Sequence, residues 1–262
     1  MIVLEAAFLP ADAASAGPRV AVVVDVLRAT STIALLLDRG CGVLLVADEA
    51  GMAAARRKRA DALVCAEETS GAIAAGADIS PSLRELRQAP LDGRDVILRT
   101  TNGTVAAQRV CGRETTCFAG SLLNARAVMS AALESAVARQ ARLQVVCAGR
   151  EQGRAYALDD IYCAGFLLDE AIRAQQRLGG DTLVLRDSAK LALDVFFRAA
   201  GPYEGLASSE SATVLCRMGC EEDIRIAAAP NTSRAVPLIE REPRTAAVVV
   251  RNLDRERHGE AA

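Results

Sequence analysis

The stretch VAVVVDVLRATST, residues 20–32, decides the fold. It begins with a continuous apolar run over residues 20–24. A short run rich in β-branched residues predicts a strand that is buried on both faces of a parallel sheet. The run stops at Asp25, so a carboxylate lies at the carboxyl edge of the sheet, where open α/β folds bind their ligands.

Polar residues crowd the start of the helix that follows this strand. Arg28, Thr30, Ser31 and Thr32 come directly before an apolar run at residues 33–37. An acid, a guanidinium and three hydroxyls so close to one strand end suit a metal ion and an anionic substrate. The alternative interpretation is a surface Asp–Arg pair with an ordinary Ser/Thr helix cap.

Apolar runs alternate with helical segments along most of the chain. We expect strands at residues 20–24, 43–46, 63–65, 95–98 and 143–147, and helices at 31–39, 50–60, 104–110, 123–139 and 158–175. Ser82 and Glu85 have the spacing of a capping box and open a further short helix. The alternation predicts an α/β fold with a mostly parallel sheet covered by helices.

The chain becomes more helical from about residue 180. Helices are expected at 180–187, 188–200 and 208–219, and strands at 224–227, 235–239 and 246–250. Pro237 and Pro243 interrupt the last two strands, which we expect to be antiparallel or edge-like. Since no linker or repeat is visible, residues 1–262 are expected to form a single α/β domain with a C-terminal elaboration.

Composition excludes several classes of protein. The formal net charge is −2, Trp is absent and aromatic residues make up 3%, so nothing favours nucleic-acid binding. No signal peptide and no membrane-spanning apolar run is visible, which predicts a cytoplasmic protein without a membrane partner. The sequence leaves the oligomeric state open and is compatible with a homo-oligomer.

The histidine and cysteine content removes further mechanisms. His258 is the single histidine, so a Ser-His-Asp triad and an HExxH metal site are excluded. The eight cysteines include no CxxC pair, and in a reducing compartment we expect them mostly as small buried residues. Cys216 and Cys220 are four residues apart, but one histidine does not complete a zinc site with them convincingly.

The loop TTNGT, residues 100–104, follows a predicted strand and has the features of an anion-binding turn. Gly103 permits close approach of the backbone, Asn102 tolerates a left-handed conformation, and the next helix offers free N–H groups. With the hydroxyls of Thr101 and Thr104, these groups would cradle a phosphate. The alternative is an ordinary Asn-Gly turn with a threonine cap.

Acidic residues also follow strands or begin a helix. Asp25, Glu67, Asp159 and Asp160 are hard oxygen ligands that suit Mg²⁺, although two adjacent acids at residues 159–160 are also favourable helix N-terminal charges. Known phosphate signatures such as the P-loop and the dinucleotide fingerprint are absent. Cys147 and Arg154 are too far apart for a cysteine-phosphatase loop, so Cys147 is expected to line the site rather than to attack the substrate.

Five separated motifs resemble the 2-phosphosulfolactate phosphatase family (ComB) in order and spacing. They are DVLRATST at residues 25–32, TTNGT at 100–104, GSLLN at 120–124, CAG at 147–149 and LDDIYCAG at 158–165. The short strings EDI at 222–224 and Val236-Pro237 resemble the same family. The likeness extends from about residue 20 to about residue 240.

The resemblance implies a three-layer α/β/α fold with a mostly parallel, mixed sheet. It also implies Mg²⁺-dependent hydrolysis of 2-phosphosulfolactate to 3-sulfolactate and phosphate, a step of coenzyme M biosynthesis. The site residues carried over are as follows. Asp25, Arg28 and Asp160 are expected to be catalytic; Thr30, Thr101, Asn102, Gly103, Thr104, Cys147 and Gly149 to bind substrate or phosphate; and Asp25, Glu67, Asp159 and Asp160 to hold Mg²⁺.

One region departs from the family pattern. The family usually has a GER-like turn and a FDxGNSP-like stretch, whereas this chain has AEE at residues 66–68 and GADISP at 76–81. If this region contacts the sulfonate, the substrate differs. The alternatives are therefore a Mg²⁺-dependent phosphatase for another small phosphorylated acid, or a non-catalytic protein that binds phosphorylated metabolites. Whether the reaction uses a covalent aspartyl-phosphate on Asp25 or direct attack by water stays open.

Overall fold

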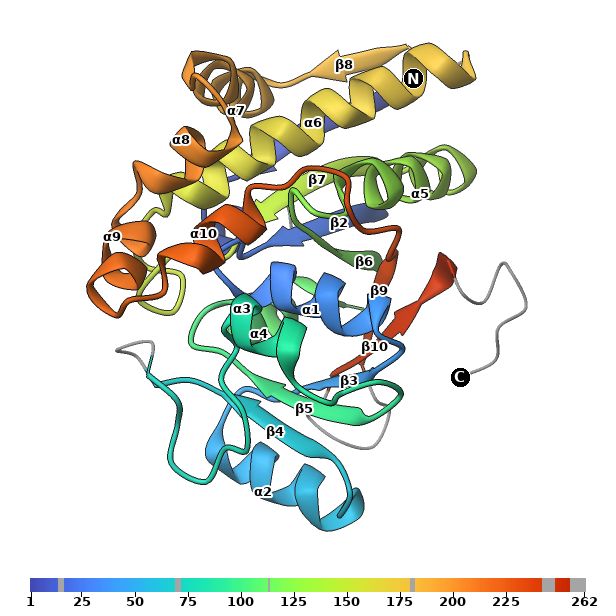
Figure 1. Cartoon of the computed structure of the whole chain (residues 1–262). Helices are drawn as coiled ribbons and strands as arrows, with labels where there is room; N and C mark the ends of the chain where they lie inside the picture. The colour runs from blue at the N-terminus through green and yellow to red at the C-terminus, as the bar shows by residue number, and fades with distance from the viewer. Residues whose placement is uncertain (14–16, 69–71, 113, 180–181, 242–247, 255–262) are drawn as a thin grey trace.

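The computed structural model describes residues 1–13, 17–68, 72–112, 114–179, 182–241 and 248–254. Within these residues, ten strands form one mixed sheet in the order β4-β5-β3-β10-β9-β6-β2-β7-β1-β8, with helices on both faces (Figure 1). The three-layer α/β/α architecture is therefore confirmed. The strands are β1 (Ile2–Ala7), β2 (Arg19–Val24), β3 (Gly42–Leu45), β4 (Leu63–Ala66), β5 (Asp95–Arg99), β6 (Thr115–Gly120), β7 (Arg142–Cys147), β8 (Leu183–Leu185), β9 (Pro237–Arg241) and β10 (Val248–Asn252).

The sheet consists of two parallel groups joined by a C-terminal hairpin. Strands β4, β5 and β3 pair in parallel, and so do β6, β2, β7, β1 and β8. Between the groups lie β10 and β9, which pair antiparallel with each other, with β3 and with β6. Three successive antiparallel pairings mean that the two groups run in opposite senses across the hairpin. The twist that accumulates along the intervening strands rotates the groups relative to each other.

Helices cover both faces of this sheet. They are α1 (Ala29–Asp38), α2 (Glu49–Lys58), α3 (Leu83–Gln88), α4 (Gly103–Val110), α5 (Ala125–Ala138), α6 (Leu158–Leu178), α7 (Asp187–Arg198), α8 (Pro202–Ala207), α9 (Glu210–Arg217) and α10 (Glu221–Ala227), with a 3-10 turn η1 (Pro10–Asp12). Helices α1 and α4 pack on the face that carries Val23, Leu45 and Ala119. Helices α5 and α6 pack on the central strands from the other side, where a Cβ at Gly120 would contact Leu167 of α6.

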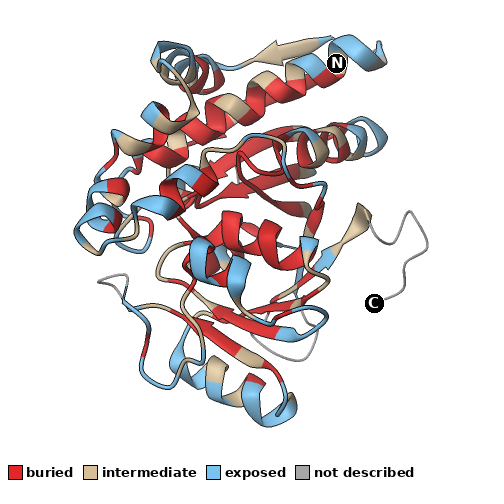
Figure 2. Cartoon of the chain, in the orientation of Figure 1, coloured by how far each residue is buried: buried red, intermediate tan, exposed pale blue. Residues whose placement is uncertain are grey.

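Buried residues concentrate in the strands and in the inward faces of the helices (Figure 2). Residues 20–24 of β2 are at most 1% exposed, because β7 and β6 flank the strand and helices cover both of its faces. The prediction of a central strand buried on both sides is confirmed. The capping box is confirmed as well, because the Ser82 side chain accepts a hydrogen bond from the Glu85 N–H at the start of α3.

Four segments differ from the sequence-based expectation. Residues 224–227 belong to α10 instead of a strand, because Glu221, Glu222 and Asp223 provide an acidic first turn that favours a helix over the β-branched Ile224 and Ile226. The expected helix at 180–187 is the short strand β8, which pairs with β1 at the sheet edge; residues 180–181 lie outside the described part. Strands β1 and β6 had no counterpart in the sequence analysis.

The C-terminal hairpin is antiparallel, as expected, but it lies in the middle of the sheet instead of at an edge. Pro237 is tolerated there because it is the first residue of β9, where the missing N–H removes little of the ladder. Pro243 lies outside the described residues.

Two further findings concern the cysteines and the membrane. Cys41, Cys65, Cys147 and Cys163 are buried, in line with the sequence analysis, whereas Cys111 and Cys117 form a disulfide that the sequence analysis did not anticipate. Among the residues that the structure describes, no helix combines the length and the apolar character needed to cross a bilayer.

Candidate active site

Asp25 lies where β2 ends, and the N-termini of two helices hold its side chain. The residue is 7% exposed. Its carboxylate accepts hydrogen bonds from the N–H groups of Ala29 and Gly103, which are the first residues of α1 and α4. Its carbonyl accepts from the N–H and the hydroxyl of Thr30, at 2.8 Å and 3.0 Å. Two positive helix ends therefore favour a negative charge at this one position.

Gly103 makes this contact sterically feasible. A Cβ at this position would lie 2.7 Å from Oδ2 of Asp25 and 2.5 Å from Cβ of Ala29. The TTNGT loop therefore needs glycine here for close approach, as the sequence analysis proposed, and the groups that it approaches are Ala29 and the carboxylate of Asp25. The loop and the end of β2 consequently meet, although β2 and β5 belong to different parallel groups of the sheet.

Carboxylates surround Asp25. Its pKa is raised to about 7, first by burial and then by the negative charges of Glu67 and Asp159, while the N–H groups of Gly103 and Ala29 oppose the rise. Glu67 also has a raised pKa, because burial outweighs its pairing with Arg28 and the N–H group of Thr101. This crowding of acids in a buried place favours either bound protons or a bound cation.

Asp159 and Asp160 begin α6, and the structure gives them different surroundings. Burial raises the pKa of Asp159 to about 6, against the hydroxyls of Ser211 and Ser209 and the charge of Arg150. Its Oδ1 is buried and has no hydrogen-bond partner among the residues that the structure describes. An unpartnered carboxylate oxygen in a buried site is costly for the fold unless a ligand satisfies it.

Asp160 holds two strand ends together. Its Oδ1 accepts the N–H of Val26 at 2.9 Å, and its Oδ2 accepts the N–H of Gly149 at 3.0 Å. The first group follows β2 and the second follows β7, which are neighbours in the sheet. Burial and the charges of Asp159 and Asp25 raise the pKa of Asp160 well above its usual range. Both oxygens thus have structural partners, in contrast to Oδ1 of Asp159.

Arg28 is held between two carboxylates. Its Nη2 donates to Glu67 Oε2 and its Nη1 to Asp223 Oδ2, each at 2.9 Å, and the arginine is 2% exposed. Asp223 Oδ1 also accepts from the Ser82 hydroxyl and from the Arg84 N–H, both at 2.9 Å. The guanidinium of Arg28, which was predicted to be catalytic, therefore pairs with two carboxylates of the protein. These ion pairs connect α1, the loop after β4 and α10.

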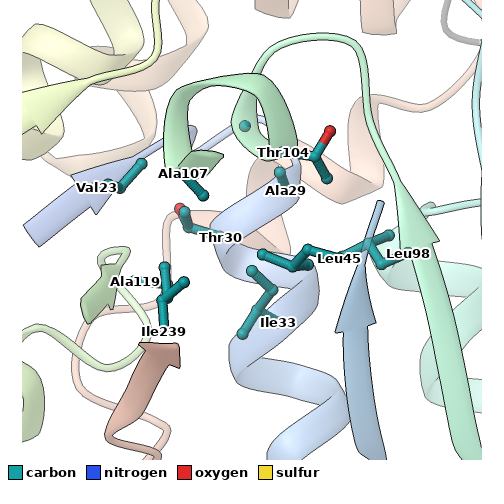
Figure 3. Close-up of a pocket in the computed structure, with 11 residues that line it drawn as sticks. Val23, Ala29, Thr30, Ile33, Leu45, Leu98, Thr104, Ala107, Ala119 and Ile239 are labelled. Atoms are coloured by element: carbon teal, nitrogen blue, oxygen red, sulfur yellow. The ribbon is translucent and has the colours of Figure 1, made fainter. Parts of the chain in front are cut away.

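The three hydroxyls after Arg28 bond to the backbone. The Thr30 hydroxyl donates to the Asp25 carbonyl, that of Ser31 to the Val26 carbonyl at 2.8 Å, and that of Thr32 to the Pro81 carbonyl at 3.1 Å. Thr30 also lines a narrow apolar cavity between α1, α4 and the sheet, together with Thr104 and aliphatic side chains (Figure 3). The role of Thr30 in phosphate binding stays a prediction.

The remaining residues of the loop make hydrogen bonds with other parts of the protein. The Thr104 hydroxyl donates to the Thr100 carbonyl at 2.7 Å, and Asn102 Oδ1 accepts the N–H of Gln152 at 2.9 Å. The latter bond joins the TTNGT loop to the turn after β7. Thr101 offers its N–H to Glu67. Binding of phosphate by Thr101, Asn102, Gly103 and Thr104 stays a prediction.

Cys147 and Gly149 lie at the end of β7, and the protein itself uses both of them for packing or for the backbone turn. Cys147 is fully buried, and burial raises the pKa of its thiol well above the usual range, which argues against a thiolate nucleophile. Gly149 has φ +68°, and a Cβ there would lie 2.6 Å from the Ala155 carbonyl oxygen, so glycine is required for the turn. Its N–H is the one that orients Asp160.

Sequence reasoning missed several residues that reach the site. Asp223 belongs to the string EDI at residues 222–224. The sequence pattern predicts a strand directly after it, at 224–227, and therefore does not predict that Asp223 is buried against Arg28. Ser209 and Ser211 come from α9 and its cap, and Arg150 follows β7. The acidic first turn of α10 was the one signal that could have placed Asp223 on a helix.

The arrangement of the acids bears on the Mg²⁺ prediction. The described residues contain no group of three His, Cys, Asp or Glu side chains arranged to hold a metal ion. They do bring Asp25 and Asp159 close enough to raise the pKa of Asp25, and they leave Asp159 Oδ1 without a partner. Mg²⁺ typically uses one or two protein carboxylates, with water and substrate phosphate completing its shell. A two-carboxylate site therefore fits, with Glu67 and Asp160 engaged elsewhere.

Comparison with known proteins points to one family of phosphatases. The family model described as 2-phosphosulpholactate phosphatase matches residues 8–242. A probable 2-phosphosulfolactate phosphatase of Deinococcus radiodurans is 36% identical over 222 residues, which is 85% of this chain and 88% of that protein. Proteins with the same description from Thermus thermophilus and Thermotoga petrophila are 36% and 31% identical, over 85% and 84% of this chain and 88% and 89% of theirs.

The chain is thus a phosphatase by class, one that hydrolyses a phosphate monoester. It belongs to the 2-phosphosulfolactate phosphatase family, as the five sequence motifs predicted.

Proposed function

We propose that this protein is a Mg²⁺-dependent phosphatase that hydrolyses 2-phosphosulfolactate to 3-sulfolactate and phosphate. The observation that carries the proposal is the pairing of Asp25 with Asp159, two buried carboxylates of which one leaves Oδ1 unpartnered, beside the Gly103 N–H at the start of α4. The family relationship supplies the substrate. The step is of the kind used in coenzyme M biosynthesis, and a cytoplasmic location is part of the proposal.

In this proposal Asp25 and Asp159 would hold the magnesium ion. When bound, Mg²⁺ would polarise the phosphoryl group and lower the pKa of a water molecule. Asp160 acts as a positioning residue, because it fixes the ends of β2 and β7 through the N–H groups of Val26 and Gly149. Arg28 fixes Glu67 against the TTNGT loop and adds positive charge to a site that otherwise collects acids.

The proposed reaction is the attack of a water oxygen on phosphorus and cleavage of the bond between phosphorus and the C2 oxygen. The C2 oxygen leaves as the hydroxyl of 3-sulfolactate. Negative charge on the phosphoryl oxygens would be met by the positive N-terminus of α4, which starts at Gly103. With the single histidine at residue 258 in the polar tail, proton transfer at this site depends on carboxylates or on the metal.

The substrate within this class rests on a second observation. In the turn where the family usually has Arg after Glu, this chain has Glu68, whose Oε1 lies 3.8 Å from Nη2 of Arg99. Arg99 Nε is buried and has no hydrogen-bond partner within the described part of the chain. This rearrangement favours, as the second candidate, a phosphorylated acid whose other anionic group differs from a sulfonate.

The test is phosphate release from a panel of substrates. The panel contains 2-phosphosulfolactate, phospholactate and 2-phosphoglycerate, each assayed with Mg²⁺ and with EDTA. Selective, Mg²⁺-dependent release from 2-phosphosulfolactate supports the proposal. Selective release from a panel member without a sulfonate supports the second candidate and overturns the proposed substrate.

A further inference from the structure

The proposed site collects acidic side chains, although its substrate is itself anionic. Asp25, Glu67, Asp159 and Asp160 face a molecule that carries a phosphate, a carboxylate and a sulfonate. Arg28 donates to Glu67 and Asp223 through its two Nη atoms, so its fork is occupied. A further cation near these acids would favour the binding of these anionic groups.

Arg150 lies at the right place. It follows Gly149 in the turn after β7, and its N–H donates to the Ala155 carbonyl at 2.8 Å while its own carbonyl accepts the Ala155 N–H at 3.1 Å. These bonds fix the backbone, so the side chain starts from a defined position. Its positive charge opposes the rise in the pKa of Asp159 that burial causes, which indicates that the guanidinium lies near that carboxylate.

The guanidinium of Arg150 pairs with Glu210, the first residue of α9. The side chain of Arg150 is 28% exposed and that of Glu210 is 77% exposed, so this ion pair lies at the boundary between the buried acids and solvent. Pairs this exposed contribute little to stability and are screened by salt. Another anion can therefore take the place of the Glu210 carboxylate at small cost.

The neighbours of Glu210 connect this pair to the site. Ser209, the N-cap of α9, and Ser211 both hydrogen-bond to Asp159. Glu210 lies between them in the sequence, so the first turn of α9 presents two hydroxyls to Asp159 and one carboxylate to Arg150. In this arrangement the Glu210 carboxylate marks a position for an oxyanion next to Asp159.

We propose that Arg150 is a substrate-binding residue that takes a tetrahedral oxyanion group of the substrate, phosphate or sulfonate, in exchange for Glu210. The inference rests on the proposed function for the identity of the substrate. Its consequence is that the two partners of one ion pair have opposite effects: loss of Arg150 weakens substrate binding, and loss of the Glu210 charge strengthens it.

Steady-state kinetics with Mg²⁺ test the exchange. Arg150→Gln is expected to raise KM at least tenfold, and Glu210→Gln to lower KM two- to fivefold. In the double variant the effect of Glu210→Gln should vanish, because its partner is absent. Arg154→Gln is the matched control: this exposed arginine of the same turn donates to the Glu151 carbonyl, and KM should stay within twofold.

A binding measurement separates this inference from the proposed function. Titration calorimetry with inorganic phosphate and with 3-sulfolactate, in the presence of Mg²⁺, needs no turnover. Weaker binding of either anion to Arg150→Gln, with circular dichroism and melting temperature unchanged, supports the inference even if 2-phosphosulfolactate is not hydrolysed. Phosphate-selective loss assigns the phosphoryl group, and sulfolactate-selective loss assigns the sulfonate. Equal affinities in wild type, Arg150→Gln and Arg154→Gln, or no binding of either anion, overturn it.

Discussion

The carboxylate of Asp25 lies directly against the α-carbon of Gly103, where two segments separated by almost eighty residues of sequence meet. A Cβ at Gly103 would approach Oδ2 of Asp25 to 2.7 Å. The contact joins the end of β2 to the start of α4, and β5, the strand before α4, lies on the other side of the β9–β10 hairpin from β2. The contact brings the Asp25 carboxylate of the DVLRATST motif to the first N–H groups of α4 in the TTNGT motif. The proposed chemistry depends on this contact.

Gly103→Ala is therefore expected to disturb the site. The added methyl group must displace Asp25 or Ala29, and overpacking of this kind costs about 1–3 kcal/mol. We expect at least a hundredfold loss of turnover with a measurable loss of stability in urea unfolding. Gly112→Ala is the control, because a Cβ there meets nothing within 4 Å. Full activity of Gly103→Ala would contradict the close approach.

Asp223 should prove essential for stability. It is fully buried and accepts hydrogen bonds from Arg28, Ser82 and Arg84. Removing one partner of a buried ion pair leaves the other charge uncompensated, so Asp223→Ala should cost about 3–5 kcal/mol. Urea unfolding measures this, with the exposed neighbour Glu222→Ala as the control, which should change stability by less than about 0.5 kcal/mol. Equal effects of the two substitutions would show that the Arg28 bridge contributes little.

Asp159 and Asp160 are adjacent but should respond differently to replacement by Asn. In Asp160→Asn one oxygen becomes an NH₂ group, which cannot accept from Val26 or Gly149, so stability should fall by about 1–3 kcal/mol. In Asp159→Asn the fold should be retained, while Mg²⁺ binding weakens. Urea unfolding and calorimetric titration of Mg²⁺ separate the two. The reverse pattern would exchange the roles of the two acids.

Stability should depend on pH through Asp25. Its pKa in the folded protein is raised to about 7, above the ordinary value near 3.8. Between these values the folded state binds more protons than the unfolded state, so this group makes stability fall as pH rises, by up to about 1.4 kcal/mol per pH unit. The slope of unfolding free energy from pH 5 to pH 7 should be less negative in Asp25→Asn than in wild type.

Magnesium should reverse this trend. A cation between Asp25 and Asp159 favours their charged forms, so added Mg²⁺ should raise the melting temperature more at pH 8 than at pH 5. Thermal melts of wild type and Asp25→Asn with and without Mg²⁺ provide the measurement. An equal shift in both proteins at both pH values would place the ion elsewhere.

Local sequence features predicted much of the site. The buried run 20–24 predicted β2 and therefore the position of Asp25, and the Asn-Gly step predicted the turn before α4. Both depend on neighbours in the sequence. The strand order could not be read in this way, because the insertion of β9 and β10 between β3 and β6 depends on long-range pairing.

The hydrogen-bond partners of the predicted site residues could not be predicted from neighbouring residues in the sequence either. Arg28 was expected to face a phosphate, yet one of its partners, Asp223, is 195 residues away in the chain. The two oxygens of Asp160 are used by backbone N–H groups of two different strand ends. The residue types alone predicted that acids and an arginine lie at the carboxyl ends of the strands. Which atoms these side chains bind depends on the packing of distant segments.

The most direct test of the central claim is phosphate release from 2-phosphosulfolactate by wild type and Asp25→Asn, each with Mg²⁺ and with EDTA. Release by wild type that requires Mg²⁺ and falls at least a hundredfold in a folded Asp25→Asn protein is the predicted result. Release that is equal with EDTA, or equal in Asp25→Asn, would contradict a magnesium-dependent site built on Asp25.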